Sequence, residues 1–114
     1  MRSADSMEYR FVKLETYIPE THLAELRRAL QEADAGHTGN YDSCLAFSHV
    51  TGTWRALAGA QPYIGAPGEV SEAPEIKVEV TLRAAQVQEV VHAVRRVHPY
   101  EEPVINLIPL LNMA

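Results

Sequence analysis

Hydrophobic and polar positions alternate along residues 76–82, and residues 9–18 follow the same rule. Alternation with a period of two is typical of a strand that buries one face. Shorter apolar runs predict a second strand at residues 41–50, which residues 52–57 extend past a bend, and a last strand at about residues 104–110.

Apolar residues recur every three or four positions in two other segments, at about residues 20–34 and residues 84–97. This spacing places them on one face of a helix. Gly36 is suited to cap the C-terminus of the first helix. Pro99 ends the second helix at His98, because the residue before a proline is disfavoured in helical geometry.

Residues 58–74 contain three glycines and three prolines. This composition predicts an irregular connection rather than a strand or helix. A connection of this length in a compact domain is usually functional or mobile. Residues 1–8 are small or polar and have no periodicity, so we expect a flexible N-terminal tail followed by a single domain at residues 9–110.

The order of predicted elements is strand, helix, strand, strand, helix, strand. Two split strand-helix-strand halves close into an α+β fold, the ferredoxin-like βαββαβ sandwich, with a four-stranded antiparallel sheet and both helices on one face. The long connection joins the second and third strands. The last strand carries apolar residues on both faces, whereas an uncovered sheet face is normally polar. We therefore expect self-association to cover that face.

Composition narrows the function classes. The 114 residues, 46% of them hydrophobic, fit one compact domain. The net charge of −5 argues against a nucleic-acid partner, and the absence of any run of 18 apolar residues argues against a membrane partner. The single cysteine, Cys44, excludes an intrachain disulfide and favours a cytoplasmic location. We expect Cys44 to be buried in a strand.

A polar and aromatic stretch, GNYDSC at residues 39–44, stands between the first helix and the second strand. Backbone N–H groups and the Asn40 amide can bind an anion or a nucleotide base there, and the Tyr41 ring can stack on such a base. The alternative is a turn in which Gly39 and Asn40 have positive φ and Asp42 accepts hydrogen bonds from the backbone.

A second stretch, HPYEEP at residues 98–103, occupies the equivalent position in the other half. His98, Glu101 and Glu102 are donor types that bind divalent metal ions. An extended backbone sends adjacent carboxylates to opposite sides, so only one of them joins His98. Three interpretations stay open: a rigid turn whose glutamates pair with nearby arginines or solvent, a polar ligand or partner site that includes Tyr100, and a metal site.

The topology separates the two stretches. The long connection lies near residues 98–103, while residues 39–44 lie at the other end of the sheet, about one strand length (~17–20 Å) away. A site that contains both stretches therefore needs two subunits. Trp54 and Arg55, at the start of the connection, can hold an anion or contact a neighbouring subunit.

Taken in order, the segments GNYDSC, GTWR, GAQPYIG and HPYEEP resemble the domain inserted in many bacterial proteins of the NGG-interacting-factor (NIF-type) family, which are also called GTP cyclohydrolase-like. That domain is similar to the CutA and PII proteins, which are ferredoxin-like trimers. The resemblance covers residues 9–110. It implies a free-standing form of the inserted domain, to which neither the ligands of the family's dinuclear metal centre nor a cyclohydrolase activity can be carried over.

We therefore expect a small regulatory module that senses a ligand or a divalent cation and assembles as a homotrimer. No catalytic residue, metal ligand or cofactor other than a divalent cation is assigned. One alternative is an interaction module for a protein that contains the dinuclear-metal domain. The other is a metal-assisted hydrolase, which lacks an identifiable nucleophile. The predicted binding residues are Asn40, Tyr41, Asp42, Arg55, His98, Tyr100, Glu101 and Glu102.

Overall fold

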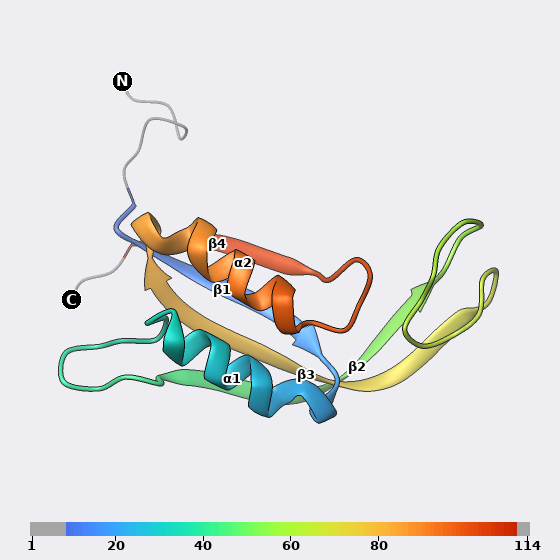
Figure 1. The fold of residues 1–114 in the computed structure, drawn as a ribbon, viewed down its shortest axis with the longest axis horizontal. Helices are drawn as coiled ribbons and strands as arrows, with labels where there is room; N and C mark the ends of the chain where they lie inside the picture. The colour runs from blue at the N-terminus through green and yellow to red at the C-terminus, as the bar shows by residue number, and fades with distance from the viewer. Residues whose placement is uncertain (1–8, 112–114) are drawn as a thin grey trace, which may run out of the picture.

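The fold is described by a computed structural model for residues 9–111, and the predicted tail at residues 1–8 lies outside this range. Both helices cover one face of a four-stranded antiparallel sheet with the order β2-β3-β1-β4 (Figure 1). The predicted ferredoxin-like sandwich is thus confirmed. The elements are β1 (Phe11–Ile18), the 3-10 turn η2 (Glu20–His22), α1 (Leu23–Glu32), β2 (Leu45–Arg55), β3 (Val70–Arg83), the 3-10 turn η3 (Ala84–Gln86), α2 (Val87–Val97) and β4 (Ile105–Leu110).

The core lies between the sheet and the two helices. The central strands β1 and β3 pair with Leu14 opposite Val80 and Ile18 opposite Ile76, which directs alternate apolar side chains of both strands toward the helices. The helices bury one face each against this layer. Their buried residues are Leu26, Ala29 and Leu30 in α1 and Val90, Ala93 and Val94 in α2.

The C-terminal cap of α1 differs from the prediction. Asp34, not Gly36, is the left-handed residue after the helix, with φ of 58°. Its N–H donates to the Gln31 carbonyl at 3.0 Å, and the Ala35 N–H donates to the Leu30 carbonyl at 2.9 Å, which is the Schellman pattern. Gly36 has a different role, because a Cβ there would collide with the Cys44 carbonyl oxygen.

Strands β2 and β3 continue beyond the rest of the sheet as a two-stranded arm, residues 50–75 (Figure 1). Their pairing extends to Arg55 opposite Val70, whereas the pairing of β1 with β3 stops at Ile18 opposite Ile76. The irregular connection is therefore residues 56–69, and its prediction over 58–74 was wrong at the C-terminal end. Pro74 is tolerated in the strand because only one edge of β3 has a neighbour there.

Strand β2 begins later than predicted, and Cys44 is exposed rather than buried. Ser43 has a positive φ of 59°, so the extended backbone cannot start before it. Tyr41 makes only an isolated bridge with Thr38. The Cys44 thiol points back to the Asp42 carbonyl, at 3.6 Å.

The sheet face opposite the helices has a polar centre. Lys13 Nζ lies 2.8 Å from Glu79 Oε1 and 3.1 Å from Glu15 Oε2, and Lys77 lies 3.7 Å from the same Glu15 oxygen. The hydrogen bond from Lys13 lowers the pKa of Glu15. Next to this network Ile108 of β4 lies opposite Lys13, so the last strand does carry apolar residues on both faces.

No helix within residues 9–111 is long and apolar enough to cross a membrane.

Replacement of Leu26 by Ala tests the core. Leu26 is 0% exposed between α1 and the sheet, so Leu26→Ala should lower the free energy of unfolding by about 2–5 kcal/mol. Leu111→Ala is the matched control, because Leu111 is 85% exposed, and it should change stability by less than about 0.5 kcal/mol. Urea denaturation measures both values. Equal losses for the two variants would contradict this core.

Candidate functional site

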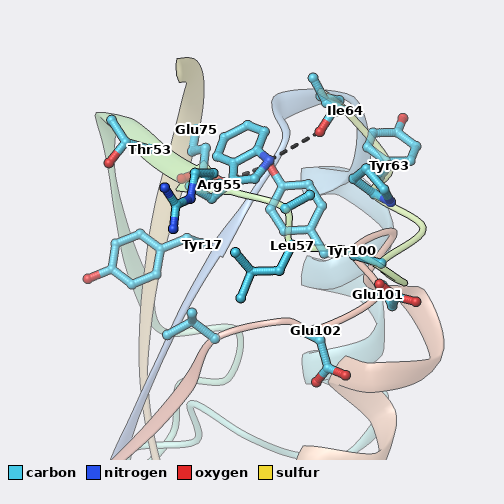
Figure 2. Close-up of a pocket in the computed structure, with 15 residues that line it drawn as sticks. Tyr17, Thr53, Arg55, Leu57, Tyr63, Ile64, Glu75, Tyr100, Glu101 and Glu102 are labelled. Atoms are coloured by element: carbon cyan, nitrogen blue, oxygen red, sulfur yellow. Dashed lines mark hydrogen bonds between the residues drawn. The ribbon is translucent and has the colours of Figure 1, made fainter. Parts of the chain in front are cut away.

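A cavity of about 540 Å³ lies between the arm, the end of β1 and the α2–β4 loop, residues 98–104 (Figure 2). Arm residues form one wall, the loop forms another, and Tyr17 stands at the end of β1. Four aromatic rings, three carboxylates and one guanidinium line it: Tyr17, Trp54, Tyr63, Tyr100, Glu75, Glu101, Glu102 and Arg55.

One aromatic ring of the cavity wall, that of Tyr100, contacts two others. The Tyr100 ring lies 6.1 Å from that of Trp54 and 6.0 Å from that of Tyr63, between ring centroids. The Trp54 indole N–H donates to the Ile64 carbonyl at 3.1 Å, as Figure 2 shows. This bond holds the irregular connection against strand β2 and fixes the plane of the indole.

A buried hydrogen bond joins the arm to the α2–β4 loop. The Tyr100 hydroxyl donates to Glu75 Oε2 at 2.6 Å, and Glu75 is only 7% exposed. Burial and this bond raise the pKa of Tyr100 far above its ordinary value. Gly52 of β2 leaves the room for the carboxylate, since a Cβ at that position would collide with Glu75. The glycine within the strand therefore has a steric purpose.

His98 lies behind the cavity and holds the loop to β1. Its Nε2 lies 2.7 Å from the Tyr17 carbonyl oxygen, and the Tyr100 backbone N–H lies 3.3 Å from its Nδ1. A carbonyl needs a donor and an N–H needs an acceptor, so this network assigns the neutral tautomer with the proton on Nε2. Burial lowers the pKa of His98. Both ring nitrogens are thus occupied.

Glu101 and Glu102 both line the cavity. The loop bends at residues 100–102, so the separation expected for an extended backbone does not apply. Glu101 Oε1 accepts a hydrogen bond from the Gln61 backbone N–H at 3.0 Å, which is a second link between the arm and the loop.

Four of the eight predicted binding residues line this one cavity: Arg55, Tyr100, Glu101 and Glu102. His98 supports them from behind. Asn40, Tyr41 and Asp42 belong to the α1–β2 connection, which Figure 1 places at the other end of the sheet, as the topology predicts. The buried carboxylate of Glu75 was missed, and its sequence signal is weak because it stands where an irregular connection was expected.

The other predicted stretch, residues 39–44, follows a turn that contacts of the His37 ring hold in place. His37 Nδ1 lies 2.8 Å from Asp34 Oδ1, and its Nε2 lies 3.0 Å from the Gly39 carbonyl oxygen. The hydrogen bond to Asp34 raises the pKa of His37, because two acceptors favour the imidazolium. Gly39 has a positive φ of 56°, as the turn interpretation predicts, whereas Asn40 does not.

Among the residues that the structure describes, no three His, Cys, Asp or Glu side chains come together in an arrangement that could hold a metal ion.

Comparison with known proteins supports the fold. A family model described as "CutA1 divalent ion tolerance protein" matches residues 63–114. The crystal structure of CutA1 from Ehrlichia chaffeensis superimposes with a TM-score of 0.69 at 17% identity, over 95% of this chain and 88% of that one. The chain is therefore a CutA1-like domain in its fold.

Closer relatives are longer proteins. A GTP cyclohydrolase 1 type 2 homolog from Halalkalibacterium halodurans is 42% identical over 100 residues, which are 88% of this chain and 27% of the relative. A Bacillus cereus protein related to NIF3 superimposes with a TM-score of 0.81 at 33% identity, over 94% of this chain and 27% of that chain. The resemblance to the CutA-like domain of NIF-type proteins is confirmed. The chain spans about a quarter of these relatives, so their names assign it no activity.

Removal of the Tyr100 hydroxyl tests the buried link. Tyr100→Phe leaves the Glu75 carboxylate with one donor fewer in a buried position, so it should cost about 1–3 kcal/mol of unfolding free energy. Tyr63→Phe is the matched control for the stability of the ligand-free protein, because Tyr63 lines the same cavity and is 50% exposed. Chemical denaturation of both variants measures the difference. A Tyr100→Phe protein as stable as Tyr63→Phe would show that the bond contributes nothing.

The neutral state of His98 predicts a pH dependence of stability. The unfolded chain binds a proton at an ordinary pKa of about 6.5, whereas the folded protein resists it because its pKa is lowered. The contribution of His98 is therefore present above about pH 6.5 and is lost as pH falls through the folded pKa.

Unfolding free energies measured between about pH 7 and 5 should fall less steeply for His98→Asn than for the parent protein. The control is His92→Asn, an exposed position on α2, which should keep the parent slope. If the unfolding free energy of His98→Asn fell with pH as steeply as that of the parent protein, the assignment of a neutral His98 would be contradicted.

Proposed function

We propose that the protein is a regulatory module that senses a small-molecule ligand and acts as a homotrimer, with the aromatic cavity as its ligand site. The observation that carries the proposal is the cavity itself. Its volume of about 540 Å³ is within the range of ordinary ligand pockets, which are mostly apolar with a few placed polar groups.

The position of the cavity supports a sensing role. One wall belongs to the arm, which extends beyond the sheet, and the other belongs to the α2–β4 loop next to the core. The links between the walls include the Tyr100–Glu75 and Gln61–Glu101 hydrogen bonds and the contacts of the Tyr100 ring with Trp54 and Tyr63. A ligand that contacts both walls would stabilise one position of the arm, which a partner protein can recognise.

The surface supports self-association. The edge strand β4 exposes apolar side chains on both of its faces, Ile108 opposite Lys13 and Leu107 opposite Leu14, and a second subunit would remove such side chains from water. The trimer is proposed by resemblance to the CutA proteins. In it the α1–β2 turn of a neighbouring subunit, with Asn40, Tyr41 and Asp42, would complete the cavity. The high exposure of Tyr41 suits this role.

A divalent cation is the second candidate ligand. Three carboxylates line the cavity, and the matching family is described by its tolerance of divalent ions. Hard cations prefer oxygen ligands of this type. Because no group of three metal-binding side chains is assembled among residues 9–111, a cation would need ligands from a second subunit or from the small molecule.

Native mass spectrometry tests ligand and assembly together. The purified protein would be measured as isolated, so that a copurifying small molecule is detected by its mass, and again after titration with Mg²⁺ and Zn²⁺. We expect a trimer that carries one adduct per subunit, and we expect Tyr41→Ala to lose the adduct while the trimer persists.

Two variants control for the assembly. Ile108→Asp places a charge in the proposed contact and should yield monomers, whereas His92→Asp, on the exposed side of α2, should leave the trimer intact. A monomeric parent protein without any adduct would contradict both parts of the proposal.

A further inference from the structure

We infer that the cavity selects an organic cation, namely an ammonium or quaternary ammonium group carried on an apolar or aromatic body. This inference rests on the proposed function, since it names the ligand class of the same site. Three observations carry it: the aromatic walls, the balance of charges and the size of the cavity.

The aromatic walls suit a cation. The centroid of the Tyr100 ring lies about 6 Å from those of Trp54 and Tyr63, and all three rings line the cavity. Tyr17 lines it at the end of β1 (Figure 2). The face of an aromatic ring carries partial negative charge and attracts cations within about 6 Å of its centroid. Several rings around one space are the usual arrangement for recognition of alkylated ammonium groups.

The charged residues of the cavity also favour a cation. Glu75, Glu101 and Glu102 line the cavity against a single basic residue, Arg55, so three negative groups and one positive group leave a charge of −2. Glu75 contributes most to the field inside, because it is buried beneath the rings and is screened least by solvent. An anionic ligand such as a nucleotide phosphate would face this field.

The volume favours an organic ligand over a bare ion. A space of about 540 Å³ is far larger than an ammonium group, and part of its wall is aliphatic, formed by Leu57, Ile64 and Val104. These side chains are 40–62% exposed, so a ligand with an apolar body would remove them from water. The cation and the apolar body thus have separate contacts.

Three probes of similar size and different charge test the inference: phenethylamine as the cation, phenethyl alcohol as the neutral analogue and phenylacetate as the anion. Trp54 is the only tryptophan of the chain, so its fluorescence reports binding in the cavity directly. We expect phenethylamine to bind about ten-fold or more tightly than the alcohol, and phenylacetate to bind most weakly.

Two variants change the charge of the cavity by one unit each, in opposite directions. Glu102→Gln should weaken phenethylamine binding by roughly three- to ten-fold, and Arg55→Gln should strengthen it by a similar factor. Glu89→Gln is the control, because Glu89 is exposed in the first turn of α2, and it should leave the affinity unchanged.

The outcomes separate this inference from the proposed function. Equal affinity for the three probes, or tighter binding of phenylacetate, would overturn the cation preference while leaving the cavity as a ligand site. Fluorescence that no probe changes at millimolar concentration would contradict both the ligand class and the site.

Discussion

The hydrogen bond between Tyr100 and Glu75 is the interaction on which the site depends. It joins the two walls of the cavity, and it exists only because Gly52 leaves space for the carboxylate beside β2. Burial of a carboxylate is costly unless donors compensate it, and the hydroxyl supplies one. The same bond directs the Tyr100 ring toward Trp54 and Tyr63, so the aromatic walls and the negative field of the cavity have a common origin.

The fold places these groups by means of strands of unequal length. At this end of the sheet β1 ends and β4 begins at the border of the core, while the pairing of β2 with β3 continues and forms the arm. The α2–β4 loop returns to the sheet at the same end, held by His98 against the last residues of β1. A ferredoxin-like sandwich with strands of equal length would have no second wall at this position, so the cavity is a consequence of the arm.

Much of the fold follows from residue patterns, because the period of apolar positions reports burial directly. It locates β1, the central part of β3 and both helices, and their order defines the sandwich. Local composition was a poorer guide. Pro74 and its neighbours have the composition of a connection, yet they pair with β2 as a strand; the other edge of β3 is free there, so a proline is tolerated. In the same way Ser43, in a left-handed conformation, delays β2 and leaves Cys44 exposed.

The candidate site was predictable only in part, for a related reason. The sequence shows two unusual polar and aromatic stretches, GTWR at residues 52–55 and HPYEEP at residues 98–103, and the topology places them at the same end of the sheet. Glu75 has no such signal, since its importance comes from a cross-strand neighbour without a side chain. The shared role of Glu101 and Glu102 depends on a bend that sequence spacing does not reveal.

The two-walled construction of the cavity also has a thermodynamic consequence. In the proposed sensing role, a ligand in the cavity and a partner that contacts the arm would act on one conformational equilibrium, the position of the arm relative to the sheet. Their affinities are then coupled by a single free energy, and the coupling is reciprocal: each occupant strengthens or weakens the other by the same factor. On that proposal, a domain of this size would relay a chemical signal between two surfaces without any change in its core.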